Sequence, residues 1–311
     1  MIAEKKQRIF HHPGLDLNSP IYRFVSWRWV EDLLIGKNLT LVRPESWDDP
    51  FEMINRPIQV RVTDKNQGYS SKVLDQHNFE VFSQSWTTKD MADTMLRAYS
   101  KLASTAAAFS APPLEFEPEQ HALEAIQIST TIGKLLGALE YGLENLAEFE
   151  SAYITQVDYM SEEELANRVV STYANGPDTG KDPACVVSLL SIKRDNYEAE
   201  NEVRPIVLLN ERAKELDYLR VKTDPEILID SITIDPRISS FKVKASGPND
   251  YVQRIELLKK WGFASKIRQS HLYAVSPIFE SVLDLDSPDL NLSAEAKARW
   301  RELHEINKVT Q

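Results

Sequence analysis

The sequence contains one cysteine and ten glycines in 311 residues, and it has no long uncharged apolar run. The single cysteine, Cys185, excludes an intramolecular disulfide, and its apolar neighbours predict a buried strand. So few glycines, with no glycine-rich phosphate loop, argue against a dinucleotide-binding Rossmann domain. No apolar run approaches the ~18 residues that a membrane-spanning helix needs, so we expect no membrane partner.

Metal-site and export signals are also missing. No two of the six histidines are three or four residues apart, so no zinc site is indicated and we expect no metal. The first residues, MIAEKKQRIFHH, lack the apolar segment of a secretory signal. These observations predict a cytoplasmic protein.

Acidic side chains outnumber basic ones by 47 to 36, which gives a net charge of −11. The excess lies in residues 112–166, which carry eleven Glu and one Asp against one Lys. Residues 237–270 are basic, with eight Lys and Arg against two acidic residues. The overall balance argues against broad nucleic-acid affinity, although the basic segment leaves a nucleic-acid acceptor open.

Strand and helix signals alternate along most of the chain. Residues 20–62 contain short β-rich runs around one helix, for which Ser26 is a suitable N-cap and Gly36 a suitable end. Residues 79–87 alternate in polarity and place two serines on one strand face. Further extended segments are expected at 184–192, 203–209, 227–234 and 272–275, and further helices at 252–263 and near Ser293.

The middle of the chain has a different pattern. Between about 90 and 170, Leu and Ile recur mostly at three- and four-residue steps, which is typical of helices. We therefore predict an α+β fold with a mixed, mostly antiparallel sheet core and a helical insertion. The expected organisation is an N-terminal arm at 1–19, a single α+β domain at 20–280 with the insertion at about 90–170, and a C-terminal helix at 281–311.

An unusual run of charge precedes the apolar residues 206–209. Glu198, Glu200, Glu202 and Arg204 follow one another at two-residue spacing. On a strand all four would share one face, where neighbouring carboxylates repel and raise each other's pKa. The alternative is a helix end, with Glu200 and Arg204 as an ordinary surface pair four residues apart.

Three polar groups appear on successive predicted strands. Arg23 lies on the first, Ser83 and Ser85 on a central one, and Glu200 with Glu202 on a late one. This order resembles that of the arginine–serine–glutamate ADP-ribosyltransferases, and the resemblance implies that Glu202 stabilises the positive ribose that forms when NAD loses nicotinamide, while Glu200 accepts the acceptor's proton. An arginine binds a pyrophosphate with its planar fork, and serines can position the carboxylate.

Plainer explanations exist for each group. Arg23 can lie on a solvated strand edge, the serines can form the polar face of a half-exposed strand, and Glu202 can pair with Arg204. Asp48, Asp49 and Glu52 could instead bind a hard cation with Glu200 and Glu202, as in a metal-dependent nuclease. A third alternative is a non-catalytic binding module in which these charges only form salt bridges.

Several segments also resemble the bacterial domain-of-unknown-function 2971 family. They are Tyr22-Arg23-Phe24, Leu39-Thr40-Leu41, Trp47-Asp48-Asp49-Pro50-Phe51-Glu52, Phe82-Ser83-Gln84-Ser85, Met95-Leu96 with Tyr99, and Lys193, Tyr197, Glu200, Glu202 and Arg204. The chain departs from that family at Leu96, where tryptophan is usual, and in its long acidic middle.

Together these resemblances imply an ADP-ribosyltransferase-like sheet and an NAD-dependent transfer of ADP-ribose to a protein or nucleic acid, in a toxin or phage-defence setting. Glu202 and Glu200 are then the catalytic candidates. The implied NAD-binding residues are Arg23, Tyr22, Ser83, Ser85, Asp49, Phe51, Tyr99 and Arg204. In this company the strand interpretation of residues 198–204 is favoured over the helix end.

Overall fold

The computed structural model describes residues 7–47, 49, 52, 59–64, 68–73, 78–99, 125–173, 181–236, 250–270, 272, 284–286 and 292–309. The chain forms two compact units, Met1–Tyr273 and Ala274–Gln311. In the second unit, α9 (Ala294–Val309) begins where a helix is predicted, and the Ser293 hydroxyl accepts a hydrogen bond from the Ala296 N–H at 3.2 Å. Within the described residues, no helix is long and apolar enough to cross a membrane.

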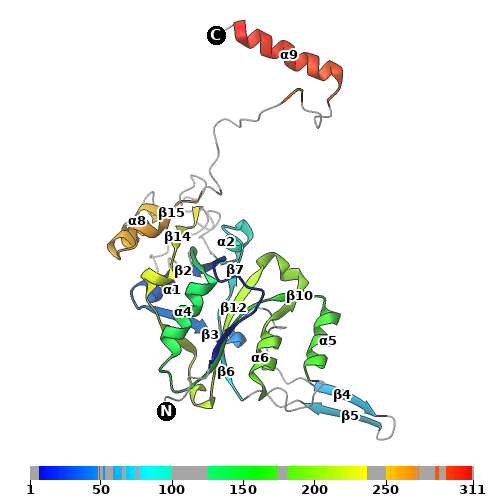
Figure 1. Ribbon diagram of the computed structural model, residues 1–311, viewed down its shortest axis with the longest axis vertical. Coiled ribbons are helices and arrows are strands. Elements are labelled where there is room, and N and C mark those ends of the chain that lie inside the picture. The colour runs from blue at the N-terminus through cyan, green and yellow to red at the C-terminus, as the bar shows by residue number, and fades with distance from the viewer. Residues whose placement is uncertain are drawn as a thin grey trace, which may run out of the picture. The chain divides into compact units, whose positions relative to one another are not determined.

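Among the described residues of the first unit, an 11-stranded sheet is the central feature (Figure 1). Its main path runs through β13 (Tyr218–Lys222), β3 (Asn38–Val42), β6 (Glu80–Ser83), β12 (Glu202–Leu209), β7 (Trp86–Thr87), β2 (Pro20–Ser26), β8 (Ala125–Thr131), β14 (Ser231–Ile234) and β15 (Ile267–Arg268). In addition, β9 (Phe149–Gln156) pairs with β12 and with β1 (Ile9–His11). The pairs β1–β9 and β14–β15 are parallel, and the other described pairs of this sheet are antiparallel. The predicted α+β class with a mostly antiparallel sheet is confirmed.

The sheet divides at Gln84-Ser85. One edge of β12 is occupied by β9 over Val203–Leu209, so β6 and β7 share its other edge. From β6 the sheet continues to β3 and β13, and from β7 it continues to β2 and β8. Because β2 meets β7 only at the pair Tyr22–Thr87, the two branches separate just beyond this point.

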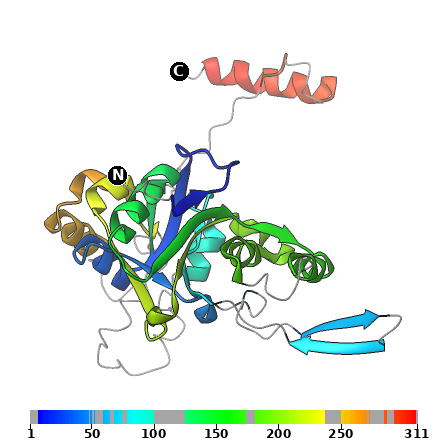
Figure 2. The ribbon, with the colours of Figure 1, turned by 60° about the horizontal axis from the view of Figure 1, so that its bottom comes forward.

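Different helices cover the two faces of β12, as Figures 1 and 2 show. α1 (Trp27–Leu34) and α4 (Ile132–Leu143) pack into the main apolar core, which includes Val203 and Val207. On the opposite face, α6 (Pro183–Leu190) packs against Ile206 and Leu208. Since side chains alternate along a strand, Glu202 and Arg204 lie on the α6 face.

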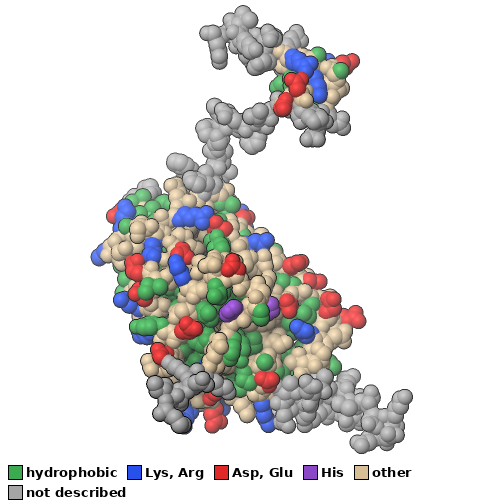
Figure 3. Space-filling model, viewed as in Figure 1, with side chains coloured by type: hydrophobic (Ala, Val, Ile, Leu, Met, Phe, Trp, Pro, Cys, Tyr) green, Lys and Arg blue, Asp and Glu red, His purple; other side chains and the backbone are tan. Residues whose placement is uncertain are grey.

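The first unit contains further described elements outside this sheet. Two further strand pairs are β10 (Asp158–Met160) with β11 (Ile192–Arg194), and β4 (Gln59–Asp64) with β5 (Gly68–Val73). The other helices are α2 (Asp93–Tyr99), α5 (Glu162–Thr172), α7 (Pro225–Leu228), α8 (Asp250–Lys260), and the 3₁₀ helices η1 (Pro44–Ser46), η5 (Asp195–Glu200), η6 (Glu211–Ala213) and η8 (Ala264–Lys266). In Figure 3 acidic side chains gather along the right-hand edge, where α5 carries Glu162, Glu163 and Glu164 in its first turn.

Local chemistry explains the helix α1. Val30, Leu33 and Leu34 point into the core, in agreement with the predicted helical spacing. Ser26 occupies the N-cap position, although its side chain makes no capping hydrogen bond. A Cβ on Gly36 would lie 2.5 Å from the Asp32 carbonyl oxygen, so the turn after the helix requires a glycine.

Three predicted segments differ in the structure. The region 90–170, expected to be helical, contains β8 and β9, because Ile126 and Ile128 are buried at two-residue spacing within a sheet. In the segment 184–192, expected to be extended, residues up to Leu190 form α6 and Ile192 begins β11; Cys185 is buried on the helix. Pro183 at the first turn, and Asp182, whose side chain accepts a hydrogen bond from the Ala184 N–H at 3.0 Å, start a helix there.

The third difference concerns the charged run before β12. Residues Asp195–Glu200 form the 3₁₀ helix η5, and the strand begins at Glu202. The favoured strand interpretation is therefore correct only from Glu202 onward. The domain boundaries after residues 19 and 280 stay predictions, and β1, within the expected N-terminal arm, pairs with β9.

Candidate active site

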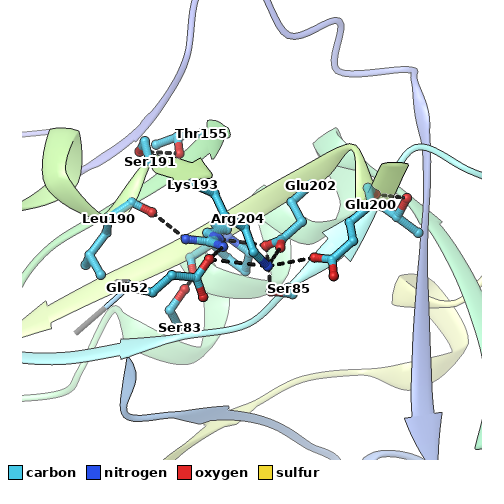
Figure 4. Close-up of polar contacts among 12 residues, drawn as sticks. Glu52, Ser83, Ser85, Thr155, Leu190, Ser191, Lys193, Glu200, Glu202 and Arg204 are labelled. Carbon is cyan, nitrogen blue, oxygen red and sulfur yellow. Dashed lines mark hydrogen bonds and ion pairs between the residues drawn. The ribbon is translucent and has the colours of Figure 1, made fainter. Parts of the chain in front are cut away.

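Six polar side chains meet at the start of β12 (Figure 4). Glu202 and Arg204 come from β12 itself, and Glu200 ends the preceding η5. Ser85 lies at the break between β6 and β7. Lys193, on β11, and Glu52 complete the group. We call these six residues the carboxylate cluster.

Glu202 is at the centre of the carboxylate cluster and is 2% exposed. Its Oε1 atom accepts a hydrogen bond from Lys193 Nζ at 2.6 Å. Its Oε2 atom accepts from Arg204 Nε at 2.7 Å and from the Ser85 hydroxyl at 2.8 Å. Three donors therefore fix this carboxylate on the α6 face of β12.

Arg204 is fully buried, and its guanidinium nitrogens are all engaged. Besides Glu202, it donates to Glu52 Oε1 at 2.5 Å and to the Leu190 carbonyl oxygen at 2.8 Å. Its Cζ atom lies 4.5 Å from the centre of the Trp47 ring, which adds a cation–π contact. The guanidinium thus connects β12 to the end of α6 and to the segment near Glu52.

Lys193 joins the three carboxylates of the cluster. Its ammonium lies 2.6 Å from Glu202, 2.7 Å from Glu200 and 3.3 Å from Glu52. The Tyr197 ring, 4.5 Å from Nζ, covers the same ammonium. A lysine that is only 6% exposed stays charged in this place because three carboxylates surround it.

The turn between η5 and β12 positions Glu200. Asn201 adopts a left-handed conformation, with φ of 47°, and this reverses the chain between the two glutamates. The Thr87 hydroxyl donates to the Glu200 carbonyl oxygen at 2.5 Å, and the Thr88 N–H donates to the Asn201 carbonyl at 3.2 Å. The Glu202 N–H donates to the Tyr159 hydroxyl at 2.9 Å, so both sides of the turn are fixed.

The environment moves the pKa values of the two glutamates in opposite directions. Burial, followed by the neighbouring Glu202, raises the pKa of Glu200 to about 7, and Lys193 opposes this shift. Burial would also raise the pKa of Glu202, but Arg204, Glu200 and Lys193 outweigh burial and hold it well below its usual range. Two carboxyl groups with separated pKa values are suited to one proton-transfer role and one charge-stabilising role.

The predicted residues Ser83 and Asp49 have other partners. The Ser83 hydroxyl is buried and donates to the Pro205 carbonyl oxygen at 2.9 Å, so it supports the β6–β12 pair. Asp49 is 5% exposed and accepts from Arg194 at 2.9 Å. Phe51 and Asp48 lie outside the described residues. Ser85 is therefore the serine of the predicted pair that touches a catalytic candidate.

Tyr22 and Arg23 lie next to each other on β2 and face opposite ways. Tyr22 pairs with Thr87, which pairs with Glu202, so Tyr22 belongs to the sheet face of Glu202. Arg23 shares the other face with Ile21 and Val25, and it lines a small pocket with Gln84, where the two branches of the sheet separate. By strand alternation Arg23 therefore lies on the opposite sheet face from Glu202, beside the break between the two branches.

Tyr99, at the end of α2, interacts electrostatically with Arg23 and with the glutamates of the carboxylate cluster. Desolvation of its hydroxyl, then Glu200 and Glu202, raise the pKa of Tyr99 to about 12, while Lys193 and Arg23 lower it. Burial lowers the pKa of Arg23 to about 10, and Tyr99 is the group that opposes this shift. Within the described part of the chain, Arg23 forms no ion pair or hydrogen bond, so its charge is available to an anionic ligand.

Sequence reasoning assigned no chemical role to Lys193 and missed Tyr159. The sequence indicated Lys193 only through the family resemblance, and Glu52 through the family resemblance and as a possible metal ligand. Lys193 directly follows the mostly apolar segment Leu189–Ile192. A charged residue at the end of such a segment is the feature of the sequence that could have indicated a buried lysine. Nothing in the local sequence around Tyr159 indicates that its hydroxyl would meet the Glu202 backbone, since this contact depends on the β10–β11 pair.

The carboxylates proposed as metal ligands are engaged by basic side chains. Lys193 and Arg204 hold Glu52 and Glu202, and Arg194 holds Asp49. Among the residues that the structure describes, no group of three or more His, Cys, Asp or Glu side chains is arranged to hold a metal ion. The geometry of the described carboxylates therefore gives the nuclease alternative no support.

Comparisons with known proteins return weak structural similarities. No family model matches the chain, including that of the domain-of-unknown-function 2971 family, and no curated protein matches it. The chain is similar to Thermus sp. 2.9 DarT in complex with ADP-ribosylated ssDNA, with 12% identity, a TM-score of 0.29, and coverage of 82% of this chain and 94% of that one. The same protein in complex with NAD⁺ gives 15% identity, a TM-score of 0.27, and coverage of 82% and 96%. TM-scores this low, with 12–15% identity, do not indicate a shared function.

Proposed function

We propose that this protein is an NAD-dependent ADP-ribosyltransferase that uses Glu200 and Glu202. The observation that carries the proposal is the glutamate pair itself. Both carboxylates bind one ammonium, that of Lys193, at 2.7 and 2.6 Å, yet their pKa values move apart. This arrangement provides one permanent negative charge and one carboxyl group that can take up a proton near neutral pH.

The reaction would proceed as a displacement at the ribose. The glycosidic bond between C1′ and the nicotinamide nitrogen breaks, and nicotinamide leaves with the bonding electron pair as a neutral molecule. An acceptor oxygen or nitrogen forms the new bond to C1′, and its proton passes to Glu200. Glu202, which is fixed by Arg204, Lys193 and Ser85, stabilises the positive charge that develops on the ribose.

Tyr99 and Arg23 provide the proposed contacts for the rest of NAD. Tyr99 is 42% exposed and lies within electrostatic range of both Glu200 and Arg23. Its ring can stack on the nicotinamide, with Tyr22 as the second aromatic candidate. The guanidinium of Arg23, which has no ion pair among the described residues, can bind the pyrophosphate where β2 separates from β7. As the family resemblance implies, the acceptor is a protein or a nucleic acid, and the setting is a toxin or a phage-defence system.

Labelled NAD tests this proposal. The purified protein is incubated with NAD that carries a label in the adenosine part, together with single-stranded DNA, double-stranded DNA, RNA or a protein extract. We expect labelled acceptor and released nicotinamide. Glu200→Gln should lower the rate by roughly 10²–10⁴-fold, the usual contribution of a general base. Glu202→Gln should abolish transfer, because the developing charge on the ribose loses its counter-charge.

Glu198→Gln is the matched control, because Glu198 is an exposed carboxylate of the same 3₁₀ helix and should keep the wild-type rate. Circular dichroism confirms that each variant is folded. Wild-type protein that leaves NAD intact with every acceptor would overturn the proposal. If NAD also fails to raise the melting temperature, while Glu202→Gln lowers it, the cluster has a structural role in a binding module.

A further inference from the structure

Lys193 is the residue that contacts all three carboxylates of the carboxylate cluster. It lies on β11 between Ile192 and Arg194 and pairs in register with Tyr159. Its ammonium is within 3.3 Å of Glu52, Glu200 and Glu202. A lysine at the centre of three carboxylates influences the charge of each of them, because electrostatic interactions are strong where water is excluded.

The two cations of the cluster are divided unequally among its three carboxylates. Glu52 and Glu202 each contact both Lys193 and Arg204. Glu200, in contrast, contacts Lys193 and has no contact with Arg204. With three negative and two positive groups, one carboxylate is left without full compensation, and Glu200 is the one with the weaker set of partners.

Exposure makes the same distinction. The side chains of Glu52 and Glu202 are 5% and 2% exposed, whereas that of Glu200 is 22% exposed. Protons from water or from a substrate can therefore reach Glu200 most directly. The weaker compensation and the greater exposure are found at the same carboxylate.

Other titratable groups face the cluster and stay uncharged. Tyr99 approaches from α2 and Tyr159 from β10, and burial is the main cause that raises the pKa of each hydroxyl. Tyr197, from η5, contributes its ring face to the ammonium of Lys193. Near neutral pH the neighbouring charges that act most strongly on Glu200 are those of Glu202 and Lys193.

We propose that Lys193 is a positioning residue that keeps Glu202 ionised while leaving Glu200 as the carboxyl group that exchanges a proton. Its single ammonium holds both carboxylates within hydrogen-bond distance, so that the pair carries one proton or none. Above neutral pH the cluster has a net charge of −1, which favours a positively charged ribose, and below it the cluster is neutral. This role rests on the proposed function, in which Glu200 accepts the proton of the acceptor group.

Replacement of Lys193 by an uncharged side chain has a definite consequence. In Lys193→Met, Glu200 loses its hydrogen-bonded cation, so its protonation midpoint moves upward from about pH 7. An upward move of one unit would lower the ionised fraction at pH 7 from about a half to about a tenth. Lys193→Arg keeps the charge and should keep a midpoint close to that of the wild-type protein.

The test measures the titration directly and needs no NAD. Protein labelled with ¹³C at glutamate side-chain carboxyls is followed by NMR from pH 4 to pH 9, as wild type, Lys193→Met, Lys193→Arg, Glu200→Gln and the exposed control Lys214→Met. We expect one carboxyl midpoint near neutral pH in wild type, Lys193→Arg and Lys214→Met. It should move upward in Lys193→Met and disappear in Glu200→Gln. When kcat is measured with NAD, the pH profile of Lys193→Met should also move to higher pH.

An unchanged midpoint in folded Lys193→Met would overturn the proposal, and so would a neutral midpoint that persists in Glu200→Gln. If Lys193→Met does not fold, the other variants still test the proposal. Loss of the near-neutral midpoint in Lys193→Arg, or its persistence in Glu200→Gln, would contradict the role of the Lys193 charge. The titration is independent of transfer activity. If Glu200 titrates as expected in all variants but the protein does not react with NAD, the enzyme proposal is refuted, while the electrostatic role of Lys193 stands.

Discussion

Arg204 shows how one residue can depend on contacts from three distant segments. Its guanidinium binds Glu202 on its own strand, Glu52 from a segment about 150 residues earlier, and the carbonyl of Leu190 at the end of α6. Burial would lower the pKa of Arg204, but Glu202 and Glu52 outweigh burial and raise it above its usual range. The charge is therefore permanent, and its loss would leave two buried carboxylates with a single cation.

We expect Arg204→Met to destabilise the fold by about 3–5 kcal/mol, because removing one partner of a buried ion pair leaves uncompensated charge. Urea unfolding followed by circular dichroism measures the change. Arg220→Met is the control, since Arg220 is 48% exposed and pairs with Asp32 at 3.3 Å. Its cost should stay below about 1 kcal/mol. Equal costs for the two variants would contradict a special role for the buried arginine.

At the scale of elements, the important features are two interruptions. The break at Gln84-Ser85 divides the sheet into two branches and places the Ser85 hydroxyl on Glu202. The turn at Asn201 ends η5 and starts β12. An uninterrupted strand over 198–204 would give Glu198, Glu200 and Glu202 equivalent positions. The turn instead separates an exposed Glu198 from the two glutamates that share Lys193.

Substitution at Asn201 tests this turn. Asn201 has φ of 47°, which a β-branched residue adopts only with strain. Asn201→Val should cost roughly 1–2 kcal/mol and should lower transfer activity, because it shifts Glu200 relative to Glu202. Asn201→Gly, which adopts positive φ readily, is the control and should remain within about 0.5 kcal/mol of wild type. A valine variant with wild-type stability and activity would show that the turn is not needed for the pair.

At the scale of the whole molecule, the carboxylate cluster belongs entirely to the unit Met1–Tyr273. The unit Ala274–Gln311 contributes no residue to it. β1, near the N-terminus, pairs with β9, and β9 pairs with β12. Stability of the site should therefore depend on the N-terminal strand and not on the C-terminal helix.

Two truncations test this expectation. Removal of residues 274–311 should leave the melting temperature of the first unit and the titration of Glu200 near their wild-type values. Removal of residues 1–19 should lower the melting temperature, because it deletes β1 and exposes the edge of β9. Differential scanning calorimetry measures both. A large destabilisation on removal of residues 274–311 would contradict the separation into two units.

Sequence patterns predicted much of the fold and part of the site. The strands around Ile21 and Leu41, the helix between them and the α+β class are confirmed, because their apolar periodicity matches the burial that the structure shows. The middle of the chain was misassigned, since buried strands such as β8 and buried helices both carry frequent Ile and Leu. The assignment of Arg23, Tyr22 and Tyr99 to NAD stays a prediction.

The order of amino acids sets which chemical groups are present and how they are spaced along the chain: Glu200, Glu202 and Arg204, with a serine at position 85. The contacts that each group makes follow from the folded chain. Strand pairing brings Lys193 and Glu52 to the same pair of glutamates, and burial makes their charges interact strongly. A pKa depends on such neighbours in space, so the difference between Glu200 and Glu202 appears only after the chain is folded.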